Sequence, residues 1–217
     1  KRLMEQIVEE QQLLRKSEMK LLQAQINPHF LYNTLDSIMW MAESGDQKNV
    51  VKMISALAQF LRLSLSGGYD TILVADELKH VENYLIIQKM RYNDQFDYEI
   101  TYDEAVLQCK TLKIVLQPIV ENAIIHGVAN LPYKGKITIN AGVRQDRLFF
   151  KVIDNGFGIR PEILDNILEE KPTTRSGMGV YNVNQRIQLM YGAEYGLQFE
   201  SQPDEGTTVS IILPLAK

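Results

Sequence analysis

The spacing of apolar residues changes near residue 93, and this change limits the folds that the chain can adopt. Before that point apolar residues recur every three or four positions, as in Val50, Ile54 and Leu57, which is typical of amphipathic helices. After it, FDYEITY (96–102) alternates between apolar and polar residues as a strand does, and strands and helices follow in mixed order. The chain is therefore expected to be an α+β protein, helical first and mixed β/α afterwards.

Three helical segments are expected in the first part. The first has a predicted core stripe of Leu31, Leu35, Ile38 and Ala42, the second follows the break ESGDQ (43–47), and the third covers roughly residues 75–92. One helical hairpin leaves an apolar surface uncovered. Two copies are therefore expected to pair as a four-helix bundle, which makes the protein a homodimer.

The first 25 residues contain no Gly or Pro and carry a 3–4 spacing of apolar residues with polar defects. This pattern fits a short coiled coil or an ordinary amphipathic helix, and both interpretations stay open. The expected domains are a coiled-coil or linker helix over 1–22, dimerisation and histidine-bearing helices over 23–93, and a β/α domain over 94–217.

A histidine follows a proline inside the helical pattern INPHFLYNTL (26–35). Pro28 predicts a kink. At about 100° per residue, His29 lies on the face opposite Leu31, so it is expected to be exposed, with Asn33 and Asp36 on its side.

Composition excludes several classes of function. The net charge of −4 and the pI near 5.5 give no basis for binding nucleic acid. The single Cys109 excludes an intrachain disulfide and fits a reducing compartment. No apolar run approaches the roughly 20 residues that span a bilayer. His80, between the charged Lys79 and Glu82, is expected to be a solvated surface residue.

The second part predicts a long apolar helix over 112–126, strands over 136–143 and 147–154, a helix over 177–191 and a closing hairpin around PDEG (203–206). Glycines follow Asp154 in VIDNGFGIR and open the last helix in SGMGVYNV. Glycines let backbone N–H groups approach a ligand, and a helix N-terminus favours phosphate. A carboxylate such as that of Asp154 can accept a hydrogen bond from an exocyclic amine of adenine.

A third motif, LQPIVENAIIHG (116–127), precedes these two. The triple ENAIIHG, DNGFG and GMGVYNV resembles the N, G1 and G2 boxes of the ATP-binding domain shared by gyrase, chaperone, mismatch-repair and histidine-kinase ATPases. Together with INPHFLYNTL and NVNQRIQLMYG, it resembles the sensor histidine kinases of the YesM/LytS type, over residues 23–213. The resemblance implies a dimeric helical bundle followed by an α/β-sandwich, a mixed sheet covered by helices, that binds ATP.

The resemblance also implies a role for each matching residue. His29 would accept the phosphoryl group, with Asn33 orienting its imidazole and Asp36 on the same face. Asn122 would bind the Mg²⁺ that bridges the ATP phosphates, and Asp154 would hold the adenine amine. The other implied nucleotide-binding residues are Glu121, His126, Gly156, Gly158, Arg175, Gly177 and Gly179, with Arg186 as a further phosphate candidate and residues 160–176 as the lid over ATP.

Three positions depart from the family pattern. Ile125 stands where relatives commonly have Lys, so a phosphate-binding charge is either missing or supplied by His126. Phe30 follows the histidine where most histidine kinases carry an acid that accepts its proton, so the base must come from elsewhere. Asp36 stands where relatives more often have Asn, and it lies about 10 Å along the helix from His29. The identity of the base stays open.

The implied activity is autophosphorylation of His29 from Mg-ATP and transfer of the phosphoryl group to an aspartate of a response regulator receiver domain. The chain would be the cytoplasmic part of a bacterial membrane sensor whose membrane part precedes Lys1. A gyrase- or chaperone-like ATPase would carry a general-base Glu four residues before Asn122, where this chain has Pro118. A catalytically inactive dimeric ATP-binding scaffold is the other alternative, and Ile125 is the feature that favours it.

Overall fold

The computed structural model describes residues 28–65, 70–164, 167 and 175–215. The predicted N-terminal helix and most of the predicted lid lie outside these residues. The chain divides into two compact units, Lys1–Ser66 and Gly67–Lys217.

The first unit contains a hairpin of two helices, α2 (Pro28–Glu43) and α3 (Gln47–Leu65). The turn between them uses Gly45 at a φ of 79°, a value that glycine adopts without strain. Asp46 then caps α3, since its carboxylate accepts a hydrogen bond from the backbone N–H of Asn49 at 3.2 Å. The break predicted at ESGDQ is confirmed. Because α2 begins at Pro28, the helix before the predicted kink lies outside the described residues.

Phe30 and Thr34 are the buried residues of α2, whereas Leu31 and Ile38 of the predicted core stripe are half-buried. The Phe30 ring packs against Phe60 of α3 with ring centroids 5.1 Å apart. Leu35, predicted to be in the core, is 49% exposed, and Ala42 is exposed as well. A helix with a single neighbour buries only the face toward that neighbour. The apolar residues of the other face therefore stay at the surface of this unit.

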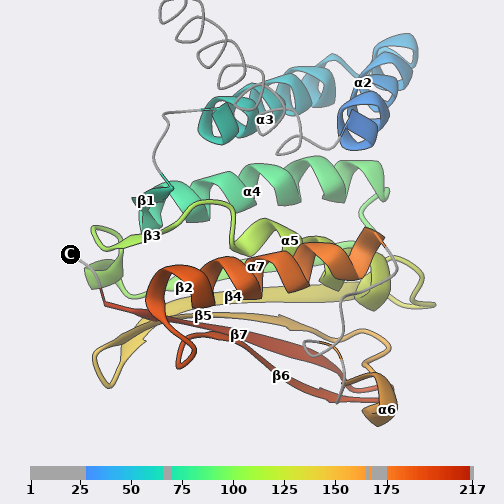
Figure 1. The fold of residues 1–217 in the computed structure, drawn as a ribbon. Coiled ribbons are helices and arrows are strands. Elements are labelled where there is room, and N and C mark those ends of the chain that lie inside the picture. Colours follow the sequence, from blue (N-terminus) through green and yellow to red (C-terminus); the bar gives the residue numbers. More distant parts are fainter. Residues whose placement is uncertain (1–27, 66–69, 165–166, 168–174, 216–217) are drawn as a thin grey trace, which may run out of the picture. The chain divides into compact units, whose positions relative to one another are not determined.

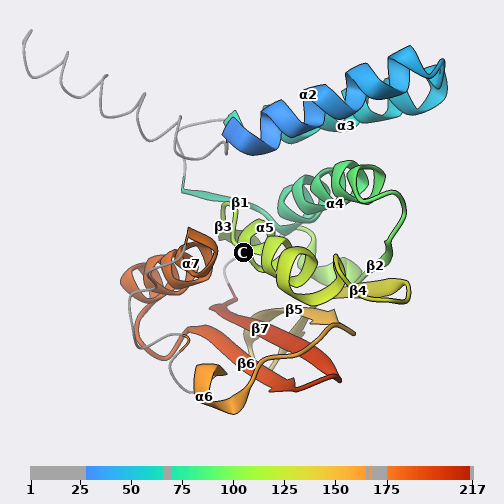
Figure 2. The ribbon, with the colours of Figure 1, turned by 90° about the vertical axis from the view of Figure 1, so that its right-hand side faces the viewer.

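The second unit is built on a five-stranded sheet in the order β2-β4-β5-β7-β6. Its strands are β2 (Phe96–Tyr102), β4 (Gly135–Arg144), β5 (Arg147–Asp154), β6 (Gly196–Gln202) and β7 (Gly206–Pro214), and all of the predicted strands are confirmed. The β2–β4 pair is parallel and the other three pairs are antiparallel, so the sheet is mixed. Helices α5 (Leu116–Asn122) and α7 (Arg175–Tyr191) lie along one face of this sheet (Figures 1 and 2).

Alternation along β5 shows where the core lies. Leu148, Phe150, Val152 and Asp154 are buried, while the residues between them are half-buried. Apolar residues of the covering helices, such as Ile119, Ile124 and Ile187, are buried as well, and α5 contacts β5 while α7 contacts β6 and β7. A mixed sheet covered by helices is the predicted architecture of this region, and it is confirmed.

Helix α4 (Val74–Arg91) packs in the second unit, against α5 and β2 (Figure 1). It is preceded by β1 (Thr71–Leu73), which pairs antiparallel with β3 (Lys110–Leu112) from within the β/α region. The compact units therefore divide at residues 66 and 67. Sequence periodicity identifies a helix but not its packing partner, and so it grouped α4 with the two helices before it.

The long helix predicted over 112–126 is interrupted in the structure. Residue 112 ends β3, α5 covers Leu116–Asn122, and a π-helical turn, η2, covers Ala123–Val128. Ile114, between the strand and the helix, has a φ of 57°, in the left-handed region that β-branched residues rarely adopt. An apolar run does not distinguish strand, link and helix, because all three are buried here. A short 3₁₀ turn, η1 (Glu104–Val106), and a short helix, α6 (Pro161–Leu164), complete the fold.

Candidate functional site: an exposed histidine and a buried aspartate

His29 lies in the first turn of α2 and is exposed, as its helical face predicts. The amide nitrogen of Asn33, one turn along, lies 3.2 Å from Nε2 and 3.3 Å from Nδ1 of the imidazole. Asn33 therefore reaches the ring, as the sequence predicted. A half-turn of this amide about its own bond would present its oxygen instead, which can accept the ring N–H. Asp36 is exposed on the same helix.

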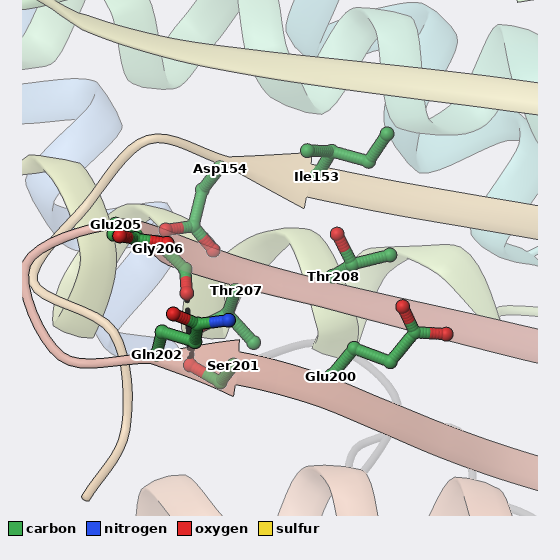
Figure 3. Close-up of a pocket in the computed structure, with 9 residues that line it drawn as sticks. All are labelled: Ile153, Asp154, Glu200, Ser201, Gln202, Glu205, Gly206, Thr207 and Thr208. Carbon is green, nitrogen blue, oxygen red and sulfur yellow. Dashed lines mark hydrogen bonds between the residues drawn. The ribbon is translucent and has the colours of Figure 1, made fainter.

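Asp154 ends β5 and is 6% exposed. Its Oδ1 accepts a hydrogen bond from the backbone N–H of Gly156 at 2.9 Å. Burial raises the pKa of the Asp154 carboxyl to about 6, although the backbone N–H groups of Gly156 and Thr207 pull the value down. Figure 3 shows the carboxylate directed toward the Gly206 end of β7. A buried carboxylate with spare acceptor capacity is suited to a ligand donor such as an amine.

Three glycines pack around Asp154. A Cβ on Gly127, in η2, would lie 2.8 Å from Oδ1 of Asp154, and a Cβ on Gly156 would overlap the backbone of Gly127. Gly206, at a φ of 103°, packs against the backbone carbonyl of Asp154. Glycine is required at these positions because the protein's own backbone segments approach closely there.

Gly158 has a φ of 68°, and a Cβ there would overlap the carbonyl of Gln202. Gly156 and Gly158 are among the nucleotide-binding residues that the resemblance implies. In the structure, the nearest atoms at both positions belong to the chain itself.

Asn122 is the last residue of α5, and η2 begins directly after it. Glu121 and Asn122 are half-buried, whereas Ile125 and His126 are exposed. A π-helical turn inside a helix is rare and is often found at functional sites. Here it brings Gly127 against Asp154, so that two of the predicted motifs meet.

The third motif lies on α7. Gly177 and Gly179 are both inside this helix, which begins at Arg175. A Cβ on Gly179 would lie 3.4 Å from Cβ of Pro118, so this glycine allows α7 to approach α5. Nη2 of Arg186 donates a hydrogen bond to the main-chain carbonyl of Lys113 at 2.8 Å. At least one donor of this predicted phosphate contact is therefore used within the protein.

A pocket of about 180 Å³ opens at the ends of β5, β6 and β7 (Figure 3). Asp154 is one of its lining residues, and the others are Ile153, Glu200, Ser201, Gln202, Glu205, Gly206, Thr207 and Thr208. Apart from Asp154, this lining contains none of the predicted nucleotide-binding residues. Acidic side chains line it, so it does not suit the phosphates of a nucleotide.

Buried polar residues of α4, among them His80 and Glu77, were not found from the sequence. His80 is 1% exposed, so the prediction of a solvated residue is wrong, and burial together with the charge of Lys113 lowers its pKa to about 4. Glu77 is fully buried and accepts three backbone hydrogen bonds. Their spacing in the sequence could have indicated their burial. Residues three or four positions apart share one helix face, and the buried residues Glu77, His80, Tyr84 and Gln88 have this spacing.

Comparison with family models matches two regions of the chain. Residues 17–96 match the family described as "Histidine kinase", and residues 108–217 match "Histidine kinase-, DNA gyrase B-, and HSP90-like ATPase". The second match contains all three predicted ATP-site motifs.

Curated relatives match nearly the whole chain. The sensor histidine kinase YesM of Bacillus subtilis is 37% identical over 212 residues, which are 98% of this chain and 36% of that protein. The sensor protein LytS of Staphylococcus saprophyticus is 36% identical over 93% of this chain and 34% of its own length. The sensor histidine kinase BtsS of Escherichia coli K12 is 33% identical over 93% of this chain and 34% of its own length. The chain thus spans about a third of the length of these relatives.

Solved structures share the fold at low identity. The catalytic domain of histidine kinase ThkA matches with a TM-score of 0.55 and 18% identity, over 68% of this chain and 97% of that one. The histidine kinase domain of a blue-light activated kinase from Erythrobacter litoralis matches with a TM-score of 0.53 and 15% identity, over 90% of this chain and 92% of that one.

Within the described residues, no helix combines the length and the apolar character needed to cross a membrane. The family matches, the relatives and the shared fold agree with one another and with the motifs. The chain belongs to the sensor histidine kinases of the YesM/LytS type, and it carries their histidine kinase region followed by their ATP-binding domain.

Proposed function

We propose that this chain is a kinase core that transfers the γ-phosphoryl group of Mg-ATP to His29 and from there to an aspartate of a response regulator. The observation that carries this proposal is the exposed His29 imidazole, contacted by the Asn33 amide, in a chain that also contains the family's ATP-binding domain. Phosphorylation takes place within one subunit or between the two subunits of a dimer.

The adenine would be bound at Asp154. At pH 7 a carboxyl with a pKa of about 6 is largely ionised, so it accepts a hydrogen bond from the adenine amine. Gly127 packs against this carboxylate, and the N–H of Gly156 donates a hydrogen bond to it. Gly158, Gly177, Gly179 and Arg175 would line the path of the phosphates, and His126 is an exposed donor on η2 near Asn122.

Mg²⁺ would be held by Asn122, with Glu121 assisting. The amide and carboxylate oxygens of these neighbours are the ligand type that Mg²⁺ prefers, and both residues are half-buried rather than enclosed, which leaves room for water and phosphate ligands. When bound, the ion would neutralise charge on the transferred phosphoryl group.

At His29, a ring nitrogen forms the N–P bond as the bond from phosphorus to the ADP oxygen breaks. The proton on the other ring nitrogen must then either leave the ring or stay there and be donated in a hydrogen bond to an acceptor. Asn33 orients the ring for this step, because its amide oxygen can accept the N–H. The exposure of His29 lets water take the proton, which is consistent with the apolar Phe30 at the next position.

The dimer and the receiver domain are the proposed partners. Tyr32, Leu35, Met39 and Trp40 are exposed on α2, and a second α2–α3 hairpin would cover apolar residues of this kind in a four-helix bundle. Because ATP and receiver domains are found in the cytoplasm, the core is expected to act there, as the cytoplasmic part of a bacterial sensor.

Incubation with γ-labelled ATP and Mg²⁺ tests the proposal. We expect label that is labile in acid and stable in base, as for phosphohistidine, and we expect its complete loss in His29→Gln. Asn33→Ala should keep the label but form it roughly fivefold more slowly, as for the loss of one hydrogen bond of about 1 kcal/mol.

Label that persists in His29→Gln would contradict the assignment of the phosphoacceptor. A chain that binds ATP but takes no label under any condition, including with a sensor region attached, would instead support the dimeric scaffold.

A further inference from the structure

We propose that Glu77 is a positioning residue for the nucleotide site, because its carboxylate anchors the segment from which α5 and Asn122 extend. The inference rests on the proposed function, in which Asn122 binds Mg²⁺. The segment concerned is residues 113–116, called the entry segment here, which links β3 to α5.

The contacts of Glu77 converge on this segment. Oε2 accepts the backbone N–H of Ile114 at 2.9 Å, and Oε1 accepts those of Val115 at 2.8 Å and Leu116 at 2.9 Å. Glu77 comes from α4, 37 residues or more before the groups that it contacts. A single side chain of another helix therefore binds three successive N–H groups at the start of α5.

The backbone of the entry segment is shaped for this contact. Ile114 is left-handed, with a φ of 57°, and Val115 is right-handed, with a φ of −97° and a ψ of −31°. Alternation of this kind turns successive N–H groups toward one point and forms an anion-binding nest. A β-branched residue is strained in the left-handed region, and such a conformation persists only where surrounding contacts enforce it.

Two other elements bind the same segment. The N–H of Lys113 donates to the carbonyl of Asp70 at 2.9 Å, and the carbonyl of Lys113 accepts Nη2 of Arg186 at 2.8 Å. Arg186 belongs to α7, whose first turns carry Gly177 and Gly179. The entry segment is thus the point at which α4, α5 and α7 are joined by hydrogen bonds.

The negative charge of Glu77 fits this position. Burial raises the pKa of its carboxyl above the ordinary value, whereas the three backbone N–H groups and the nearby Arg186 charge lower it. An anion at the start of a helix also interacts favourably with the helix dipole.

Asn122 lies six residues after Leu116, about 9 Å along the helix at 1.5 Å per residue. A change at the entry segment therefore moves the start of the helix that carries Asn122. Asp154 lies on β5, which is held by its neighbours β4 and β7. Loss of the Glu77 contacts should accordingly weaken interactions made by Asn122 and leave those made by Asp154.

Glu77→Gln is the sharpest variant, because it keeps the shape and replaces one acceptor oxygen by a donor that faces an N–H. Glu82→Gln is the matched control, since Glu82 is on the same helix but forms an exposed ion pair with Lys79. Amide exchange should show faster exchange at residues 114–116 in Glu77→Gln and unchanged exchange in Glu82→Gln. If Glu77→Gln does not fold, the same measurements are made on Glu77→Asp, which keeps the charge on a shorter side chain.

The decisive measurement is calorimetric binding of two ligands, Mg-ATP and metal-free ADP. We expect Glu77→Gln to weaken Mg-ATP binding about tenfold and to change metal-free ADP binding by less than about twofold. In an Asn122→Ala background the substitution should have no further effect, whereas it should be additive with Asp154→Asn.

Equal weakening of both ligands, or additivity with Asn122→Ala, would show a merely structural Glu77 and overturn the inference. A wild-type chain that binds neither ligand would instead refute the proposed function, so the two failures are distinguishable.

Discussion

Phe30 directly follows the proposed acceptor histidine, at a position where most histidine kinases carry an acid that accepts its proton. Here the side chain is 5% exposed and packs on Phe60 in the core of the helical hairpin. A carboxylate in that place would lose its hydration without a partner, which is costly. The side of α2 that carries Asn33 is therefore where the chemistry of His29 must be supported.

Asp154 predicts a pH dependence of nucleotide binding. Its pKa is raised to about 6, so the carboxylate is mostly ionised at pH 7 and mostly protonated at pH 5. Because a charged acceptor binds an amine donor more strongly, the affinity for ATP should fall about fivefold from pH 7 to pH 5. Calorimetry at pH 5, 6 and 7 measures this change.

The comparison with Asp154→Asn separates this effect from titration of the ATP phosphates, because the amide does not titrate. Asp204→Asn is a control at an exposed turn position, where Asn accepts the positive φ of 63°. Equal pH profiles in wild type and Asp154→Asn would contradict the role of this carboxylate.

At the scale of elements, the π-helical turn η2 connects two motifs that are distant in sequence. It follows Asn122 directly and brings Gly127 to Asp154, so the N-box helix and the end of β5 form one surface. The sequence predicted a single helix here because its apolar residues continue without a break. The change from α- to π-helix depends on packing against the sheet, which no local pattern contains.

Gly127→Ala should therefore weaken ATP binding more than Gly179→Ala. A Cβ at residue 127 would lie within 2.8 Å of Asp154 Oδ1, whereas a Cβ at residue 179 would meet Pro118 at 3.4 Å, close to ordinary contact. Overpacking of this kind costs about 1–3 kcal/mol. Thermal unfolding and ATP titration of both variants check this, and equal effects would show that Gly127 does not set the carboxylate position.

At the scale of the whole molecule, the exposed apolar residues of α2 differ from isolated surface residues because several lie on one helix. Trp40 is 78% exposed, and Tyr32, Leu35 and Met39 accompany it. A contiguous exposed apolar surface marks an interaction site. In a chain of this family, a second copy of the hairpin is the partner that we propose.

Leu35→Glu should shift the protein from dimer to monomer, because a charge in an apolar helix interface costs several kcal/mol. Leu189→Glu is the matched control, since Leu189 is 85% exposed on α7 in the other unit. Sedimentation velocity measures the mass of both. A Leu35→Glu variant with the mass of the wild type would contradict the proposed interface.

Local pattern in the sequence determined the class of the fold, the strands of the five-stranded sheet, the exposed face of His29 and its contact with Asn33. Each of these depends on residues close in sequence, through helix and strand periods, and the motif order led to the family. Tertiary structure alone decided the packing of α4 against α5, the burial of His80 and the bonding of Glu77 to residues 114–116. The hydrogen bonds of Glu77 join residues 37 to 39 positions apart in the sequence, and another joins Asp70 to Lys113. They form because buried N–H groups must find acceptors wherever the folded chain brings one.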